Sequence, residues 1–397
     1  MTISRVLRCA ITLCASAGIL AGCNAAGTQT GYAPWIAGQS NGAARPNGTA
    51  HYYLVLLDTP AGSTSHANGI NNNGWITGFA NVSGKTTTHA ALWRSGHRTD
   101  LGTLGGPDSF VGWPIKATTG QIVGGSDIPA HDPLDEKFCG APQICLGFSW
   151  KNGVMTALQP LGGNNAQALG VNNNGQVVGV AETGVHDATC AAPQQLDYSA
   201  VVWQRNGTKI ALPPIAGDTV SQAIAVNKAG WVVGASGPCG PVLNIAYGAT
   251  HAVLWQTGSA IDLGNLGGTA LNAATAINDH GQIAGASGLP GNTTLHAFLW
   301  QSGIMSDLGT LPGAVQSVAY GMNNQGQVVG NSCTAANKCH GFLWQNGSMT
   351  DLNLLVSHSP ITITYAGDVN DSGWIIGNGF DKKAGKTRAF VLIPGGK

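Results

Sequence analysis

Charged residues are scarce in this sequence. Lys, Arg, Asp and Glu make up 9% of the 397 residues, and 18 basic residues balance 18 acidic ones. The chain therefore has no basic stripe for nucleic acid and no net charge to steer a charged partner, so we expect no nucleic-acid partner. Glu is especially rare, since only Glu136 and Glu182 occur. Chemistry that depends on carboxylates would rest on few side chains.

Several sequence motifs with known chemistry are also missing. The sequence contains no phosphate-binding glycine loop, no H-E-x-x-H pair, no C-x-x-C pair and no Ser-His-Asp signature. Beyond the N-terminal segment, no stretch keeps a helical period. We therefore expect an all-β chain, with no cofactor, no metal site and no assigned catalytic residue.

Internal repetition is the main feature that the sequence does have. The segment NGINNNGWITG at 68–78 returns as LGVNNNGQVVG at 169–179. Copies recur every 45 to 57 residues or so, roughly the length of one supersecondary unit. Each copy begins with an apolar residue. The next position is usually Asn, and two variable residues, a Gly and an apolar pair closed by a second Gly follow it. The closing glycines are Gly78, Gly124, Gly179, Gly234, Gly285, Gly330 and Gly377. The second copy is degenerate, with Ile115-Lys116-Ala117 in place of the usual start.

Each repeat predicts four short β-strands. Asn-x-x-Gly supplies the hairpin turn between the first two strands, and W-x-x-G supplies the turn between the last two. The second strand is apolar at adjacent positions, as in Val177 with Val178 and Ile375 with Ile376. Burial on both sides is expected when each small sheet packs between two others, as propeller blades do. The sequence thus predicts a seven-bladed β-propeller, and a β-solenoid is the alternative.

The two ends of the repeat region complement each other. The seventh copy stops at Ala389-Phe390-Val391-Leu392 and has no fourth strand. Residues 53–60 loosely match the missing element, the D-L-G-x-L strand that ends the other copies. A ring needs its last blade completed, whereas an open solenoid needs polar caps. We therefore expect the N-terminal strand to close the ring.

The repeat resembles a known family. Residues 51–394, with His296-Ala297-Phe298-Leu299-Trp300 as the cleanest instance, are similar to the HAF repeat of bacterial extracellular proteins. The resemblance implies an extracellular repeat protein but brings no catalytic residues. The degenerate second copy and the missing Trp in the seventh depart from the pattern.

The N-terminus has the layout of an export signal. Arg5 and Arg8 precede an apolar stretch that is too short to span a bilayer. Leu-Ala-Gly-Cys at 20–23 resembles the bacterial lipobox, which implies lipidation of Cys23, and an ordinary signal with a chance Cys is the alternative. Asn24, rather than an Asp, follows this Cys. Resemblance to the sorting behaviour of lipoproteins therefore implies the outer membrane. We therefore expect a signal peptide at 1–22, a lipidated Cys and flexible tether at 23–49, and the propeller at 50–397. The membrane would be a partner through the lipid anchor, with the protein facing the periplasm or the cell surface.

Six cysteines remain after Cys9, Cys14 and Cys23 are set aside, an even number in an oxidising compartment. Two pairs lie six residues apart, and the other two occupy matching connections of neighbouring repeats. The preferred pairing is Cys139–Cys145, Cys333–Cys339 and a cross-blade Cys190–Cys239 bridge. A zinc site is the alternative, although no C-x-x-C spacing supports it.

Strand direction divides the connections between two faces of the predicted ring. The Asn-x-x-Gly and W-x-x-G turns lie on one face, which we call the turn face. The second-to-third-strand and blade-to-blade connections lie on the other, which we call the loop face. The loop face carries every long insertion and all six remaining cysteines. We expect a ligand site there, because a rigid scaffold presents its loops for binding.

Two insertions on the loop face, residues 126–146 and 181–198, form the candidate site. The candidate ligand-binding residues are Asp132, Asp135, Glu136, Glu182, His186 and Asp187. They suit a cation, a sugar or a basic peptide, and solvated acids that maintain solubility are another interpretation. The preferred hypothesis is a lipid-anchored, non-catalytic binding or scaffolding protein of the bacterial cell envelope, whose ligand is a glycan or a protein. The alternative is an envelope polysaccharide-active enzyme that uses Glu136 and Glu182 as acid and base.

The repeated histidines and aspartates have a structural interpretation. His89, His251, His296 and His340 recur at one position of the repeat, and Asp100, Asp262, Asp307 and Asp351 recur at another. Equivalent positions on different blades lie far apart, so one metal ion would not gather them. We expect hydrogen bonds within each blade instead.

Overall fold

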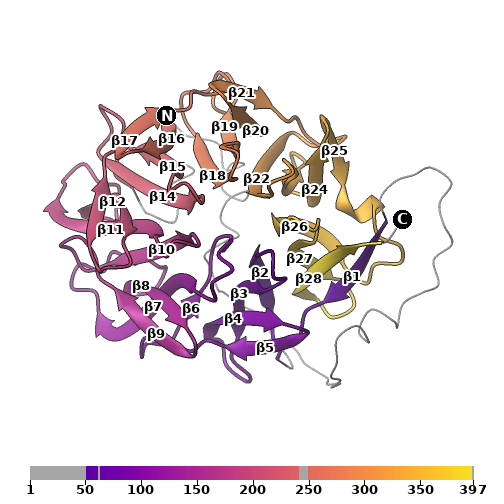
Figure 1. The fold of residues 1–397 in the computed structure, drawn as a ribbon, viewed down its shortest axis with the longest axis horizontal. Helices are drawn as coiled ribbons and strands as arrows, with labels where there is room; N and C mark the ends of the chain where they lie inside the picture. Colours follow the sequence, from indigo (N-terminus) through magenta and orange to yellow (C-terminus); the bar gives the residue numbers. More distant parts are fainter. Residues whose placement is uncertain (1–50, 61–62, 241–248, 396–397) are drawn as a thin grey trace.

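The computed structural model describes residues 51–60, 63–240 and 249–395. These residues form seven four-stranded antiparallel sheets around a central axis (Figure 1). The protein is a seven-bladed β-propeller, which confirms the predicted fold class. The predicted signal peptide, Cys23 and the tether lie outside the described residues. Within the described ranges, no helix is long and apolar enough to cross a membrane.

The first strand of each blade lies next to the axis and the fourth lies at the rim (Figure 1). Blades 1 and 2 contain β2 (Ser65–Ile70), β3 (Ile76–Asn81), β4 (Thr88–Arg94), β5 (His97–Asp100), and β6 (Ser109–Phe110), β7 (Ile122–His131), β8 (Gln143–Lys151), β9 (Val154–Leu158). Blades 3 and 4 contain β10 (Ala166–Val171), β11 (Val177–His186), β12 (Leu196–Trp203), β13 (Lys209–Leu212), and β14 (Val220–Val226), β15 (Val232–Gly237), β16 (His251–Gln256), β17 (Ser259–Asp262). Blades 5 and 6 contain β18 (Ala273–Ile277), β19 (Ile283–Gly288), β20 (Leu295–Gln301), β21 (Ile304–Asp307), and β22 (Gln316–Met322), β23 (Val328–Cys333), β24 (Cys339–Gln345), β25 (Ser348–Asp351). Blade 7 contains β26 (Thr362–Val369), β27 (Ile375–Asp381), β28 (Lys386–Pro394) and β1 (Tyr52–Leu56), and the short 3-10 helix η4 (Leu352–Leu354) precedes it.

The N-terminal strand closes the ring, as the complementary ends predict. β1 pairs antiparallel with β28, from Tyr52 opposite Pro394 to Leu56 opposite Phe390. The backbone N–H of Tyr52 also donates to the carbonyl oxygen of Leu355 at 3.0 Å. Blade 7 therefore joins both ends of the repeat region, and its outer edge is covered by a paired strand.

The hydrophobic core lies between the blades. In the second strands, Val177, Val178, Ile375 and Ile376 are all buried. Ile376 of blade 7 belongs to a cluster with Ile70 of blade 1, so packing continues across the point where the ring closes. Each blade buries both faces of its sheet against its neighbours, which explains why the second strand does not alternate between apolar and polar residues.

The repeated Asn stabilises both its own turn and the ring. In blade 5, Asn278 Oδ1 accepts the backbone N–H groups of His280 and Gln282 at 3.0 Å each. Its Nδ2 donates to the carbonyl oxygen of Asn323 in blade 6 at 3.1 Å. Equivalent bonds to the next blade start from Asn71, Asn172, Asn227, Asn323 and Asn370. In blade 2, Ala117 occupies this position and cannot donate such a bond.

Blade 2 departs from the repeat near the axis. Its inner strand β6 contains only Ser109 and Phe110, and Pro114, which has no N–H to donate, follows shortly after. Lys116 Nζ reaches past blade 1 to blade 7, where it contacts Asp368 Oδ1 and donates to the carbonyl oxygen of Val369 at 2.7 Å. The Asp368 side chain is fully buried. The degenerate copy therefore places a salt bridge between blades 2 and 7.

Candidate functional site

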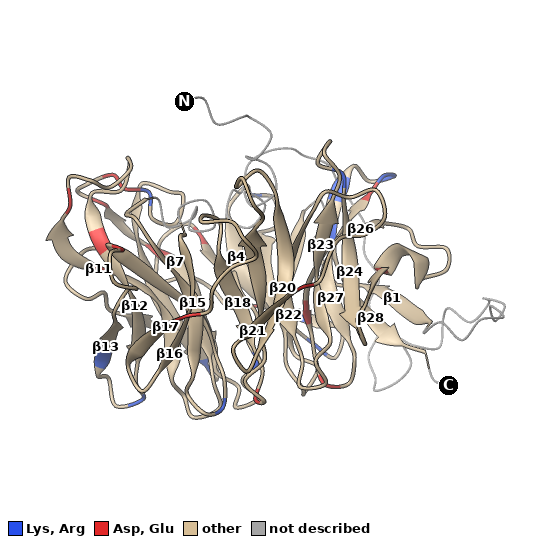
Figure 2. Cartoon of the chain, turned by 90° about the horizontal axis from the view of Figure 1, so that it is seen from above, with Lys and Arg blue, Asp and Glu red and all other residues tan. Residues whose placement is uncertain are grey.

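The two insertions of the candidate site are largely strands. β7 and β8 extend to residues 131 and 143, and β11 and β12 extend to residues 186 and 196. The hairpin tips are therefore residues 132–142 and 187–195, which are shorter than the expected loops. The ladder continues past register shifts after Asp127 and Glu182, because the extended strands keep pairing beyond the blade core. Figure 2 shows acidic segments at this end of β11.

Glu182 lies inside the protein, at the base of the blade 3 hairpin. Its side chain is 0% exposed. Glu182 Oε2 accepts the backbone N–H groups of Asn164 and Asn165 at 2.9 Å each. Glu182 Oε1 accepts Asn165 Nδ2 at 3.1 Å and Gln194 Nε2 at 3.2 Å. The carboxyl group therefore ties the connection between blades 2 and 3 to the hairpin that it belongs to.

Glu136, at the tip of the blade 2 hairpin, is also buried, with 2% of its surface exposed. Its Oε1 accepts the backbone N–H groups of Gln195 and Leu196 at 2.7 Å each, and Gln194 Nε2 at 3.1 Å. All three donors belong to the blade 3 hairpin. Glu136 therefore joins the two hairpins across the boundary between the blades.

Asp132 completes a group of three buried carboxyl residues. Its Oδ2 accepts the backbone N–H of Glu136 and the Nδ2 of Asn165 at 3.1 Å each. We call Asp132, Glu136 and Glu182 the acid cluster. In the part of the chain that the structure describes, no Lys, Arg or His forms an ion pair with any of them. Amide donors hold the cluster together instead.

Within the acid cluster, the pKa of Glu182 is raised above its ordinary value. Burial raises the pKa of Glu182 to about 7, and the adjacent hydrogen-bonded and charged carboxyl group of Glu136 adds to the shift. Glu136 Oε2 is buried and has no N–H donor among the described residues. A protonated carboxyl group at Glu182 would be the donor that the cluster otherwise lacks.

Asp127, at the start of the blade 2 insertion, is a second buried residue with a raised pKa. Burial raises the pKa of Asp127 to about 7, and the negative charge of Asp108 adds to the shift. The backbone N–H of Asp127 donates to the carbonyl oxygen of Asp108 at 2.9 Å. Both insertions therefore contain a carboxyl group whose pKa is raised by burial.

The other three candidate residues lie at the surface. The side chain of Asp135 is 55% exposed, and His186 is exposed as well. Asp187 Oδ1 accepts the backbone N–H and the hydroxyl group of Thr189 at 2.7 Å each, which lowers the pKa of Asp187. The interpretation of the insertions as solvated acids that maintain solubility fits Asp135. The same interpretation does not fit Glu136, Glu182 or Asp132, which are buried.

All three disulfides form as predicted. They join Cys139 to Cys145, Cys190 to Cys239 and Cys333 to Cys339. The carboxylates of Asp187 and Asp197 lie within 4.8 Å of the sulfur atoms of Cys190 and Cys239. Because these sulfur atoms are bonded to each other, they are not available as thiolate ligands for zinc. The cross-blade bridge instead fixes the tip of the blade 3 hairpin to blade 4.

In blades 1, 5 and 6 the recurring His and Asp residues form a hydrogen bond within the blade, as expected. His89 Nδ1 lies 2.9 Å from Asp100 Oδ1, and His296 Nδ1 lies 2.9 Å from Asp307 Oδ2. His340 forms the same pair with Asp351 at 2.6 Å. Blade 4 differs, because His251 Nδ1 lies 2.8 Å from Asp218 and its Nε2 lies 3.8 Å from Asp262. Each pair bridges neighbouring strands or connections of one blade.

The turn face contains a polar cavity that the sequence analysis did not predict. It lies where the Asn-x-x-Gly turns converge, and Lys228, Asp279 and Asp371 line it together with several Asn residues. The sequence analysis expected a ligand site on the loop face only and did not predict a cavity near the axis on the turn face. A signal was present in the sequence, because these three charged residues follow the repeated Asn where other copies have Asn or Thr.

Comparison with known proteins assigns no family and no activity to this chain. No family model matches the sequence, and no curated protein does. Among solved structures, the chain is similar to a gluconolactonase from Xanthomonas campestris, with 11% identity, coverage of 88% of this chain and 99% of that one, and a TM-score of 0.39. It is also similar to the extracellular domain of a one-component system from B. thetaiotaomicron, with 7% identity, coverage of 85% and 39%, and a TM-score of 0.47. The chain thus spans well under half the length of the second structure. Likeness at these identities says nothing about activity.

Proposed function

We propose that this chain is a non-catalytic binding or scaffolding protein of the bacterial cell envelope. It would recognise an envelope glycan or protein with the tips of the β7–β8 and β11–β12 hairpins. The burial of the acid cluster is the observation that carries this proposal. The cluster and two disulfides hold the tips rigidly, and Asp135, Val185 and His186 remain exposed on and beside them. Rigid presentation of exposed side chains suits recognition, because less freedom is lost on binding.

The position of the two Glu residues disfavours the alternative of a polysaccharide-active enzyme. A glycosidase holds its two carboxyl groups about 5 to 9.5 Å apart, on either side of the sugar bond. Glu136 and Glu182 instead both accept Gln194 Nε2, at 3.1 and 3.2 Å, and are 2% and 0% exposed. A sugar cannot enter between them unless the two hairpins separate.

A lipid anchor at Cys23 is part of the proposal. The support is the Leu-Ala-Gly-Cys sequence at 20–23 and the apolar stretch before it. Tyr52 pairs with Pro394 at the end of β28, so the chain enters the propeller at the rim of the turn face. The loop face is therefore the face remote from the attachment point, and it would be free to meet a partner. Multiple acyl chains would hold the protein stably at the outer membrane.

Metabolic palmitate labelling tests the anchor. We expect the wild type to incorporate label and to fractionate with the outer membrane, whereas Cys23→Ser should do neither. Equal labelling of the two proteins would contradict lipidation.

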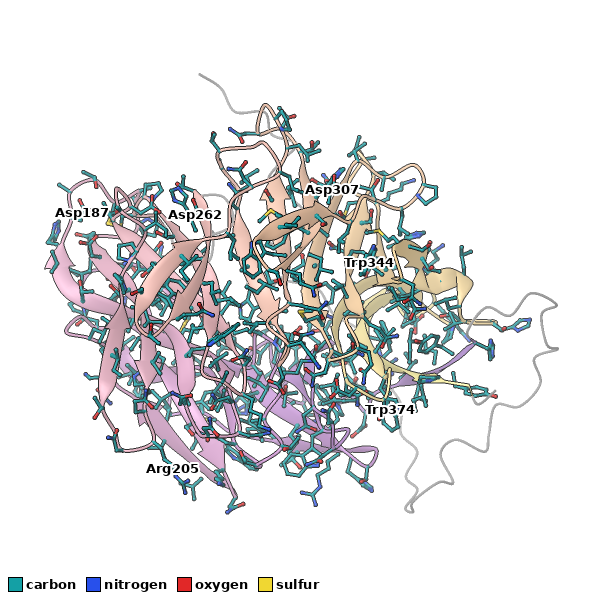
Figure 3. All side chains as sticks on the ribbon, turned by 45° about the horizontal axis from the view of Figure 1, so that its top comes forward. Asp187, Arg205, Asp262, Asp307, Trp344 and Trp374 are labelled. Atoms are coloured by element: carbon teal, nitrogen blue, oxygen red, sulfur yellow. A yellow bond between two sulfur atoms is a disulfide. The ribbon has the colours of Figure 1, made fainter. Side chains whose placement is uncertain are left out.

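Binding to glycan arrays and pull-down from envelope extracts test the recognition surface. The triple variant Asp135→Ala/Val185→Ser/His186→Ala should lose most binding to any partner found with the wild type. Arg205→Ala is a matched control, because Arg205 lies at the opposite end of blade 3 from Asp187 (Figure 3). Hydrolysis of an envelope polysaccharide by the wild type that Glu136→Gln/Glu182→Gln abolishes would overturn the proposal in favour of the enzyme.

A further inference from the structure

The cavity on the turn face has the size for a small ligand. Its volume is about 100 Å³, and its floor is formed by Ala117, Val226, Ile277 and Met322, which are all buried. One water molecule needs about 10–15 Å³ of such space, so several water molecules or one compact organic molecule would fit. Sites for drug-sized ligands are larger, about 300–1,000 Å³. The cavity therefore selects a molecule with few heavy atoms and a short apolar group.

The wall of the cavity follows a hydrogen-bonding rule. We call the residue after the repeated Asn the rim position, because it lines the cavity; this rim is that of the cavity and not the outer rim of the propeller. At this position the backbone N–H donates to the side-chain oxygen of the next blade in five of the seven blades, and Asn72 and Asn173 are the exceptions. Asp279 donates to Asn324, Asn324 to Asp371, and Asp371 to Asn72, each at 2.9 Å. The rule requires an acceptor at each rim position, and both Asn and Asp provide one.

Lys228 breaks this rule in blade 4. An ammonium group cannot accept, so the backbone N–H of Asn173 in blade 3 has no partner within the described ranges. The Nδ2 of Asn173 and the Nζ of Lys228 form no hydrogen bond or ion pair with the described residues either. On the other side of Lys228, Asp279 uses Oδ1 to accept the backbone N–H of Lys228 at 2.9 Å, which leaves Oδ2 without a donor there.

These three successive rim positions place opposite charges beside an apolar floor. Asn173 and Lys228 provide donors and a positive charge, and Asp279 provides a negative charge. The remaining charges are already used: Lys116 pairs with Asp368, and Asp371 accepts from Asn324 and Asn72. The free groups therefore match a molecule that carries both charges.

We propose that the turn-face cavity binds a small zwitterion of the α-amino acid type. The carboxylate of the ligand accepts from Lys228 and Asn173, and its ammonium group donates to Asp279 Oδ2. A short aliphatic side chain covers Val226, Ile277 and Met322. Charge-assisted hydrogen bonds at both ends would provide specificity. This site is separate from the proposed recognition surface, which lies on the loop face.

Calorimetric titration of the full chain in detergent with alanine and valine tests the proposal. Propionate lacks the ammonium group and ethylamine lacks the carboxylate, so each should bind at least about tenfold more weakly than alanine, because one charged contact is missing. Saturable binding of alanine or valine is expected. Its absence for both, or equal binding of propionate, would overturn the proposal.

Two variants separate ligand binding from folding. Lys228→Asn removes the ammonium group and restores an acceptor for the N–H of Asn173, as Asn324 does for Asp279. Asp279→Asn removes the carboxylate and keeps the acceptor for Lys228. Both should fold as the wild type does and bind alanine at least about tenfold more weakly. Unchanged affinity in both folded variants would contradict the assignment.

The result is independent of the loop-face proposal. The triple variant of the hairpin tips should bind alanine as the wild type does, because the two sites lie on opposite faces. Lys228→Asn should in turn keep the envelope partner. Loss of alanine binding in the hairpin variant would show that the cavity is not a separate site.

Discussion

The two faces of the propeller are stabilised in different ways. On the turn face, one residue type makes the same bonds in six of the seven blades, as Asn278 does in blade 5. On the loop face, the bonds that hold the blade 2 and blade 3 hairpins together involve residues such as Glu136 and Gln194, which recur in no other copy. The comparison shows that the repeat encodes the frame, whereas individual substitutions and insertions encode what is specific to this protein.

The largest effect that we predict is on the loop face. Replacing Cys190 and Cys239 by Ala should lower the free energy of unfolding by about 4 kcal/mol, because the bridge closes a long loop in the unfolded chain. Its sequence separation is 49, compared with 6 for Cys333 and Cys339. The same replacement of the second pair should cost about 2 kcal/mol. Urea denaturation measures both values, and equal losses would contradict the prediction.

The acid cluster should make stability depend on pH. The pKa of Glu182 rises from 4.5 to about 7 on folding, so the folded state holds its proton more tightly. The stabilisation is complete below pH 4.5 and is lost as the pH rises towards 7, by an amount on the order of 3 kcal/mol. Asp127 acts in the same direction.

Glu182→Gln isolates the contribution of the cluster. Gln keeps an acceptor for the backbone N–H groups of Asn164 and Asn165 and does not titrate, while its NH2 group gives up the bonds that Oε1 accepts from Asn165 Nδ2 and Gln194 Nε2. Between pH 4.5 and 7, the stability of the variant should fall less than that of the wild type. Asp127 should account for the fall that remains. Thermal melts across this range provide the measurement. A variant with the same pH profile as the wild type would contradict the raised pKa of Glu182.

Removing the hydrogen bonds of one repeated Asn on the turn face should lower the free energy of unfolding by a somewhat smaller amount. Asn278→Ala removes bonds to two backbone N–H groups and to the carbonyl oxygen of Asn323. The expected loss is about 2 kcal/mol, because buried polar groups are left unpaired. Gln325→Ala, an exposed change in the next turn, is the control and should stay within about 0.5 kcal/mol of the wild type. Similar urea midpoints for the two variants would argue against the role of the repeated Asn.

The smallest predicted effect repairs the ring. Ala117→Asn supplies the donor that blade 2 lacks and directs it to the carbonyl oxygen of Asn172. We expect the free energy of unfolding to rise by about 1 kcal/mol, the net value of one hydrogen bond. A fall in the urea midpoint would show that the blade 2 turn, with Lys116 beside it, does not adopt the geometry of the other blades.

The sequence was sufficient to predict the fold and part of the candidate site. Seven phased copies predict the blades, and paired apolar residues such as Val177 and Val178 predict packing on both sides. The incomplete seventh copy predicts the pairing of β1 with β28. Matching connections in neighbouring copies also predict the Cys190–Cys239 bridge. These features follow from the repeat, since each copy has the same neighbours in space.

The burial of Glu136 and Glu182 could not be predicted in this way. Acidic residues in an insertion are typical of solvent-exposed loops, and no copy offers a parallel. Their donors are Gln195 and Asn165, which approach only when the two hairpins lie side by side. The cavity was overlooked for the same reason, because seven turns from distant segments must converge before Lys228 and Asp279 have a common environment.

The sequence by itself thus determined the number of blades, their strand order, the closure of the ring and the disulfides. Each depends on a pattern that recurs along the chain or on spacing between matched positions. Only the tertiary structure decided which carboxyl groups are buried and have raised pKa values, and which charged residues meet at the axis. These properties depend on contacts between blades, and desolvation and charge act through distance in space rather than separation in sequence.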